Sequence, residues 1–190
     1  MKNTLADILL RWPLMESMLR VPVAMAHAVL PSMIERKAGI IISTTLQTGI
    51  IQLPFMSAES VAKSALIKFH HQLDLETSSK GIISYAVNPG PIPSHLHDPS
   101  MPFVLNPEHA AQEMDAHQKL TAMASKVSWA AAGLASGTFL TLCAEPRARV
   151  LSGLYVNAER DLEELITRME KDRGRKVARD RMYVLKVDEY

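Results

Sequence analysis

The chain has 190 residues, of which 47% are hydrophobic and 22% charged, a composition typical of one globular domain with its own core. Its 21 basic and 20 acidic residues leave a net charge of +1, so no broad field attracts nucleic acid or an anionic membrane surface. Cys143 is the only cysteine, which excludes an internal disulfide and a cysteine-rich metal site. We therefore expect a single soluble, cytoplasmic domain over residues 1–190, with residues 160–190 as a C-terminal extension.

The first part of the chain predicts two helices and a strand. A short helix over residues 4–10 is disturbed by Pro13, and a second helix begins at Pro22 and runs to about Lys37. Pro31 falls inside this second helix, where we expect a kink or a break. Residues 40–43 are a continuous apolar run, typical of a strand that is covered on both faces.

The middle of the chain predicts a long helix followed by a strand. Ser57 is a favourable N-cap residue for the helix, which should end near Gly81. Residues 82–87 form a second apolar run, closed by Asn88-Pro89-Gly90. The stretch 91–107 contains five prolines and no regular period, so we expect a loop or a lid.

Further helices are predicted over residues 108–124, 126–144 and 161–171. Gly133 and Gly137 lie in the second of these, where another element could approach closely. Strands are predicted over residues 154–157 and 182–187. Because helices and strands alternate, the sequence predicts a parallel sheet with helical crossovers, an α/β fold.

Four segments, in this order, resemble the short-chain dehydrogenase/reductase superfamily. Residues 20–37 are similar to the fourth helix of that family, and Gly39-Ile-Ile-Ile-Ser43 followed by Gly49 resembles the strand that leads to its catalytic serine. Glu59-Ser-Val-Ala-Lys63 resembles the helix with its Tyr-x-x-x-Lys motif, and Asn88-Pro-Gly-Pro-Ile-Pro-Ser94 resembles its Pro-Gly turn. The likeness covers roughly residues 12–160, and residues 152–161 are similar to fungal members. It implies a truncated Rossmann-like three-layer sandwich, a short parallel sheet with helices on both faces.

The resemblance also implies a catalytic set that this chain largely lacks. The family uses a tyrosine as general acid/base, a serine, a lysine and an asparagine. The corresponding positions here are Glu59, Leu46, Lys63 and, most nearly, Met18, so only the lysine remains. A leucine side chain can neither donate nor accept a hydrogen bond. We therefore do not expect hydride transfer by the family's mechanism.

The cofactor site of the family has no counterpart in the sequence. A Gly-rich turn between the first strand and helix holds the nicotinamide dinucleotide in that family, with the pyrophosphate at the helix N-terminus. Gly39 is the first glycine in this chain. We therefore expect no cofactor. Adjacent side chains on a helix point about 100° apart, so His70 and His71 make a poor ligand pair and we expect no metal site.

Glu59 and Lys63 are the candidate catalytic residues, because both should face the former active-site cleft one helical turn apart. The alternative is structural: an acidic residue in the first turn favours the helix dipole and pairs with a lysine four positions later. The residues expected to line the substrate cleft are Thr45, Leu46, Pro91, Ile92, Ser94 and His95.

Three classes of function remain open. The first is a cofactor-independent isomerase, cyclase or lyase that acts on an apolar small molecule in a biosynthetic pathway. The second is a silent partner that joins the oligomer of a full-length relative, and the third is an inactive fragment. We favour the first, because the core pattern and the Pro-Gly turn remain coherent. We also expect a homodimer or a higher oligomer. It would cover either the outer edge of the strand 40–43, which would otherwise stay unpaired, or the two long helices, which the resemblance implies as the usual dimer surface.

Overall fold

The computed structural model describes residues 12–53, 56–92, 122 and 128–172. Its centre is a parallel sheet of three strands, β1 (Gly39–Thr44), β2 (Ile82–Asn88) and β3 (Tyr155–Asn157), in the order β1-β2-β3. Gly39 pairs with Ile82 at the start of β1, and Ala86 pairs with Tyr155. The predicted strands 40–43, 82–87 and 154–157 and their parallel arrangement are confirmed.

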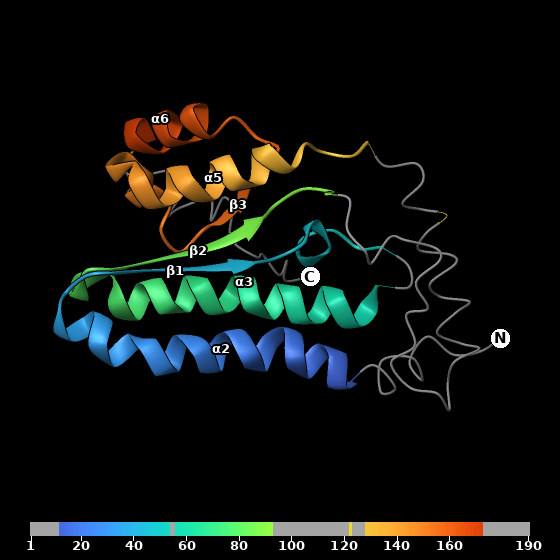
Figure 1. Cartoon of the computed structure of the whole chain (residues 1–190), viewed down its shortest axis with the longest axis horizontal. Coiled ribbons are helices and arrows are strands. Elements are labelled where there is room, and N and C mark those ends of the chain that lie inside the picture. The colour runs from blue at the N-terminus through green and yellow to red at the C-terminus, as the bar shows by residue number, and fades with distance from the viewer. Residues whose placement is uncertain (1–11, 54–55, 93–121, 123–127, 173–190) are drawn as a thin grey trace, which may run out of the picture.

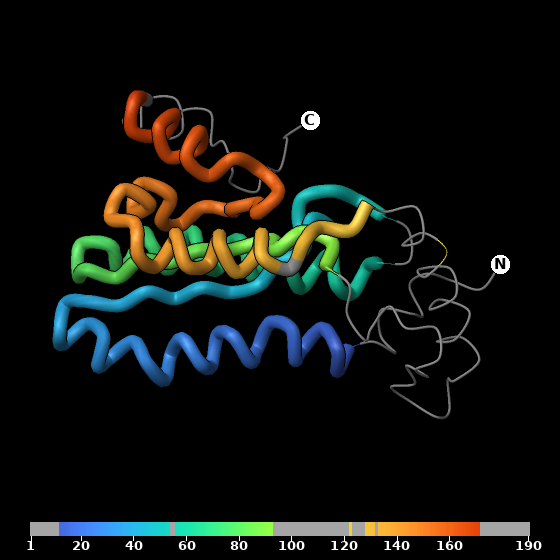
Figure 2. Tube along the Cα trace, turned by 45° about the horizontal axis from the view of Figure 1, so that its top comes forward, coloured from blue at the N-terminus to red at the C-terminus, as the bar shows by residue number. Residues whose placement is uncertain are grey.

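Helices cover both faces of this sheet (Figure 1). Helix α2 (Trp12–Glu35) and helix α3 (Ser57–Thr77) lie side by side on one face, and α3 packs against β2. Helix α5 (Ala132–Ala144) lies on the other face, and α6 (Leu162–Asp172) lies farther out on the same side (Figure 2). Short 3-10 turns join the elements: Gln47–Gly49, Ser78–Lys80 and Pro146–Leu151. The arrangement is the predicted three-layer α/β sandwich.

The two faces of the sheet contribute to separate parts of the core. On the α5 side, Tyr85, Val87 and Val156 are buried against apolar side chains of α5, α6 and the turn between α5 and β3, namely Leu142, Ala148, Leu151, Leu165, Ile166 and Met169. On the α3 side, Ala86 and Tyr155 pack against Ile67. Successive residues of a strand point to opposite faces, which assigns Tyr155 and Val156 to different layers.

Helix α2 differs from the prediction. It is one continuous helix of 24 residues that contains Pro22 and Pro31, so the predicted start at Pro22 is wrong, and of the kink or break predicted at Pro31 the break does not occur. Pro13 is the second residue of this helix. The N–H groups of the first turn have no intrahelical acceptor, so a proline, which lacks an N–H, is tolerated there. Packing against α3 then holds the helix together through the two interior prolines. By length and composition alone, α2 is the one helix of the described chain that could cross a membrane.

Three smaller predictions also need correction. Ser57 is the first helical residue of α3, and the capping position is Met56, which makes no side-chain cap. Helix α5 begins at Ala132 and not at residue 126. Apart from the chain neighbours and the nearby backbone of α5 itself, no described atom lies within 4 Å of a Cβ placed on Gly133 or Gly137, so these glycines do not mark a close approach of another element within that part of the chain. The elements predicted over residues 4–10, 108–124 and 182–187 fall wholly or almost wholly outside the described residues.

Candidate active site

The candidate site is built from the loop that follows β1 and the first turns of α3. Thr45 N donates to Val87 O at 2.7 Å, which carries the backbone of this loop one residue beyond the β1–β2 ladder. A Cβ on Gly49 would lie 2.8 Å from the Cδ1 of Ile67 and 3.2 Å from the carbonyl carbon of Lys63. A glycine at this position therefore lets the loop lie directly against α3.

Two side chains of α3 hold the two ends of this loop. Lys63 Nζ donates to Thr44 O at 2.9 Å, and Ser64 Oγ donates to Gly49 O at 2.7 Å. The backbone between Thr44 and Gly49 is thereby fixed over the helix. Leu46 lies at the middle of this segment with an extended backbone and a half-buried side chain.

Glu59 lies one turn before Lys63 on α3, within the first turn of the helix. Its Oε2 atom is buried and has no hydrogen-bond partner in the described structure. Burial lowers the pKa of Lys63, and the charge of Glu59 partly offsets this effect. The structural alternative predicted an ion pair between Glu59 and Lys63. That ion pair is not formed, because the Lys63 ammonium group donates to Thr44 O instead. A favourable interaction of Glu59 with the helix dipole remains as the structural alternative.

Unpartnered polar atoms concentrate in this region. Across the described residues, six buried side-chain N or O atoms lack a hydrogen-bond partner, and four of them belong to the loop or to the first turn of α3: Thr45 Oγ1, Thr48 Oγ1, Glu59 Oε2 and Ser60 Oγ. Buried polar groups in native proteins are nearly always paired, so each exception needs an explanation such as a bound ligand or water. The cluster marks this loop and helix start as a place where an external polar group would be stabilised.

The apolar replacements predicted from the sequence lie in the same region. Met18, at the position most nearly matching the family's asparagine, packs against a small cluster of Met15, Ala58 and Ala62. Its thioether cannot take the part of an amide in a proton relay. Met18 and Leu46 therefore make the surroundings of Glu59 and Lys63 more apolar than a hydroxyl and an amide would.

The other predicted cleft residues follow β2. Gly90 has a φ of 81° and donates its N–H to Asn88 Oδ1 at 3.2 Å, which forms the predicted turn. Pro91 and Ile92 are half-buried, and Pro91 O accepts from Ala130 N at 2.8 Å. The structure thus places Pro91 beside the segment that leads into α5. Ser94 and His95, and most of the predicted lid 91–107, lie outside the described residues.

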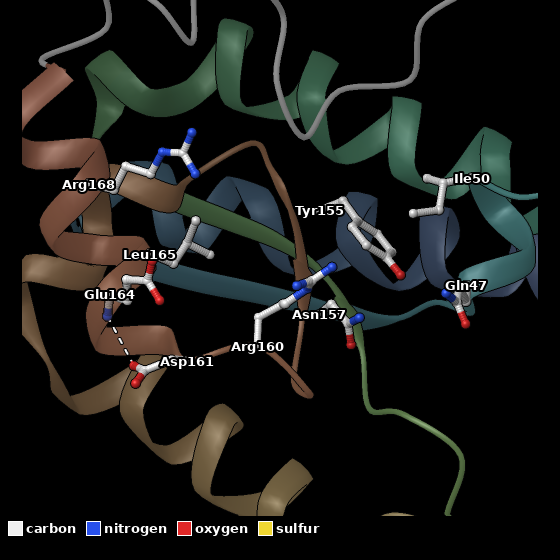
Figure 3. A pocket seen from close by; sticks show the side chains of 9 residues that line it. All are labelled: Gln47, Ile50, Tyr155, Asn157, Arg160, Asp161, Glu164, Leu165 and Arg168. Carbon is white, nitrogen blue, oxygen red and sulfur yellow. Dashed lines mark hydrogen bonds between the residues drawn. The ribbon is translucent and has the colours of Figure 1, made fainter. Parts of the chain in front are cut away.

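A cavity of about 550 Å³ lies elsewhere, between α6, β3 and the loop after β1 (Figure 3). Neither it nor a second cavity of about 370 Å³ is lined by Glu59 or Lys63. The sequence prediction missed Tyr155 and Asn157, which line the larger cavity. Their position at the carboxyl end of a parallel strand is the signal that could have identified them. The described residues contain no cluster of three or more metal-ligating side chains.

Comparisons with known proteins agree with this fold. Residues 13–102 match the family model of the short chain dehydrogenases. A short chain dehydrogenase of Pseudocercospora fijiensis is 33% identical over 181 residues, which cover 95% of this chain and 57% of that protein. The short chain dehydrogenase pigC of Monascus ruber is 27% identical over 155 residues, which cover 82% of this chain and 45% of that protein. The chain therefore spans about half the length of these two relatives.

Solved structures show the same architecture. A putative NAD(P) dependent gluconate 5-dehydrogenase from Beutenbergia cavernae superposes with a TM-score of 0.59 at 15% identity, over 83% of this chain and 57% of that one. A 4-hydroxyisoleucine dehydrogenase complexed with NADH superposes with a TM-score of 0.55 at 19% identity, over 75% and 55%. Identities this low establish the fold alone. The relative from Pseudocercospora fijiensis, which is 33% identical over 95% of this chain, shows that the chain belongs to the short-chain dehydrogenase/reductase superfamily.

Proposed function

We propose that this chain is a non-redox member of its superfamily, an isomerase, cyclase or lyase that moves protons on a small-molecule substrate of secondary metabolism. The observation that carries the proposal is the buried, unpartnered Oε2 of Glu59 beside the partly desolvated ammonium of Lys63. The relatives are named dehydrogenases, and the proposal departs from their names because of Glu59 and Leu46.

The chemistry of this pair suits proton transfer next to a carbonyl group. The Glu59 carboxylate takes a proton from the substrate carbon, and the bonding electrons move onto the carbonyl oxygen to give an enolate. Lys63 uses one of its three N–H donors on Thr44 O, which leaves two to stabilise that oxygen. In a β,γ-unsaturated carbonyl substrate this enolate is a dienolate, and the Glu59 acid returns the proton to its γ-carbon as the electron pair of the carbonyl oxygen re-forms the C=O bond. The substrate is rearranged without net oxidation or reduction.

The described glycines form no open Gly-rich turn of the kind that holds the pyrophosphate of a dinucleotide, and Gly133 and Gly137, the two with open space around them, lie within helix α5. Those with positive φ are Gly81, Gly90 and Gly153, and a Cβ at each of them would meet protein atoms at 3.1 Å or closer. Gly39 and Gly49 are packed against Met33 and Ile67 in the same way. This close packing supports chemistry that does not depend on a nicotinamide cofactor held by these residues.

The first test uses proton exchange as the readout. Purified protein is incubated in D2O with a panel of cyclic ketones and β-keto esters, and deuterium incorporation next to the carbonyl is followed by NMR. We expect the wild-type protein to catalyse exchange and Glu59→Gln to catalyse it at least about a hundredfold more slowly. Glu76→Gln, an exposed acid on the same helix, is the matched control. Undiminished exchange in Glu59→Gln contradicts the assignment of Glu59 as the base.

The second test addresses the cofactor. NADH and NADPH are titrated into the wild-type protein by calorimetry, and we expect no saturable heat. Tight binding of either nucleotide would overturn a cofactor-independent function, whatever the exchange assay gives. Native mass spectrometry on the same sample reports a retained apolar small molecule, which the proposal expects.

A second candidate function is that of a silent partner of a full-length relative. The observation in its favour is that β1 is the edge strand of the described sheet, with β2 as its one neighbour there. Exposed strand edges readily pair with another chain. Copurification of a longer relative with this chain, together with an inactive exchange assay, would favour this function over the enzymatic one.

A further inference from the structure

The cavity between α6, β3 and the loop after β1 has the apolar side chains of Ile50 and Leu165 at opposite ends, with polar side chains between them (Figure 3). Two segments far apart in the sequence, residues 47–50 and 155–168, line it with Gln47, Ile50, Tyr155, Asn157, Arg160, Asp161, Glu164, Leu165 and Arg168. Its volume of about 550 Å³ lies in the range of sites that hold small organic ligands. It does not include Glu59 or Lys63, so it is separate from the proposed catalytic pair.

Tyr155 is the buried polar group of this cavity. The residue is 5% exposed, and its hydroxyl oxygen is buried without a hydrogen bond of normal geometry. Burial raises the pKa of Tyr155 to about 12, and the Asn88 amide opposes this shift without forming such a bond. The group is therefore a protonated O–H donor at neutral pH. Figure 3 shows the hydroxyl pointing toward the part of the cavity that Gln47 lines.

The Asn157 side chain presents a second donor. Its Oδ1 accepts from Asn88 Nδ2 at 3.4 Å and from Glu159 N at 3.1 Å. These two bonds fix which end of the amide is the oxygen, because both partners are donors. The Asn157 NH2 group is thus left to donate to a molecule in the cavity.

The charged side chains of the lining differ in whether they already have a hydrogen-bond partner. The guanidinium groups of Arg160 and Arg168 form no ion pair or hydrogen bond with another described residue, although Arg160 N donates to Asn157 O at 3.0 Å. Asp161 already accepts, through Oδ1, from Glu164 N at 3.0 Å at the start of α6. Two arginines against two carboxylates give a neutral lining, which suits a singly charged ligand better than a polyanion.

From these contacts we propose that the cavity binds an organic monocarboxylate. Its carboxylate oxygens would accept hydrogen bonds from the Tyr155 hydroxyl, the Asn157 amide and the Arg160 guanidinium. Guanidinium groups match the planar geometry of a carboxylate, and a neutral amide or hydroxyl adds specificity. The carbon skeleton of the ligand would lie against Ile50, the apolar side chain that lies on the same side of Tyr155 as Gln47 (Figure 3).

The test is a calorimetric titration of the full chain with benzoate, benzamide and inorganic phosphate at one ionic strength. Benzoate carries a single carboxylate on an apolar ring, benzamide is its neutral isostere, and phosphate lacks a carbon skeleton. We expect saturable binding of benzoate and at least about tenfold weaker binding of the other two probes. Equal binding of benzamide or phosphate, or no binding of benzoate, would overturn the proposal.

Two variants assign the binding to this cavity. Tyr155→Phe keeps the ring and its packing, and Arg160→Gln keeps a polar side chain at the exposed position, so both should fold. Each should weaken benzoate binding at least about fivefold, whereas Arg20→Gln on α2 should leave it unchanged. If both cavity variants bind as the wild type does, benzoate is bound elsewhere and the proposal fails. Glu59→Gln should bind benzoate normally, so the outcome does not depend on the proposed catalytic function.

Discussion

Lys63 Nζ lies 2.9 Å from Thr44 O, and this hydrogen bond connects the middle of α3 to the last residue of β1. The bond accounts for the position of the lysine, which a sequence pattern alone would assign to an ion pair with Glu59. Because the ammonium is held by a carbonyl group, the Glu59 carboxylate one turn away keeps a buried oxygen without a partner. The two side chains are therefore close enough to influence each other's charge without neutralising each other.

Lys63→Met should lower the free energy of unfolding by about 1 kcal/mol, the usual contribution of one hydrogen bond. Methionine keeps the apolar stem of the lysine, so the loss reports mainly the bond to Thr44 O. Removal of the partly buried Lys63 charge favours the folded state, which offsets part of this loss in the free energy of unfolding. Urea denaturation of both proteins measures the difference. Lys68→Met, at an exposed position of the same helix, should change it by less than about 0.5 kcal/mol.

His70 should make the protein less stable in mild acid. The side chain is fully buried, its Nδ1 lies 2.8 Å from Ser84 Oγ, and burial lowers its pKa from 6.5 to about 4. The unfolded chain therefore binds a proton between about pH 6.5 and 4 that the folded chain refuses. Stability is unaffected above this window and falls as the pH decreases through it, by up to about 3 kcal/mol.

The measurement is the difference between the wild type and His70→Asn in urea denaturation at pH 7.5, 5.5 and 4.5. Asparagine can keep a donor near Ser84 Oγ but does not titrate, so its stability should depend less on pH over this interval. His27→Gln, at an exposed position of α2, controls for the loss of a histidine. Parallel pH profiles for the wild type and His70→Asn would show that His70 is not responsible.

The strands were predictable because their signal is local. The runs at 40–43 and 82–87 are apolar and covered by helices on both sides, and the structure extends them by only one or two residues. Helix α2 was not predictable in the same way. The propensity cost of Pro22 and Pro31 is local, whereas the packing against α3 that offsets it is a tertiary effect.

Two glycines in different backbone conformations should respond in opposite ways to replacement by alanine. Gly81 has a φ of 79°, and a Cβ there would overlap the carbonyl group of Lys37. Gly81→Ala should therefore destabilise the protein by more than about 2 kcal/mol. Gly137 is exposed in the middle of α5, and a Cβ there would meet no described atom within 4 Å outside the nearby backbone of α5 and the chain neighbours. Gly137→Ala should therefore stabilise the protein by about 0.5–1 kcal/mol. Thermal unfolding of the two variants should show shifts of opposite sign.

Only part of the candidate site could be predicted from the sequence. The spacing between Glu59 and Lys63 is four residues, so a helix brings them to one side without any knowledge of the rest of the fold. The cavity lined by Gln47, Tyr155 and Arg168 depends on two segments that lie more than a hundred residues apart in the sequence. No periodicity connects such segments, because their proximity is a result of the order of strands in the sheet.

The exposed side of α2 gives the last prediction. Val21, Met25 and Val29 are 51%, 66% and 40% exposed, and their spacing of four residues places them along one side of the helix. We propose that a second copy of the chain covers this stripe, since aligned apolar side chains on a surface favour association. Met25→Glu should then convert a dimer to a monomer at micromolar concentration in sedimentation velocity, because the buried carboxylate would have no partner. His27→Glu, exposed on another side of α2, should leave the dimer intact, and a wild-type protein that sediments as a single monomeric species would rule the proposed dimer out.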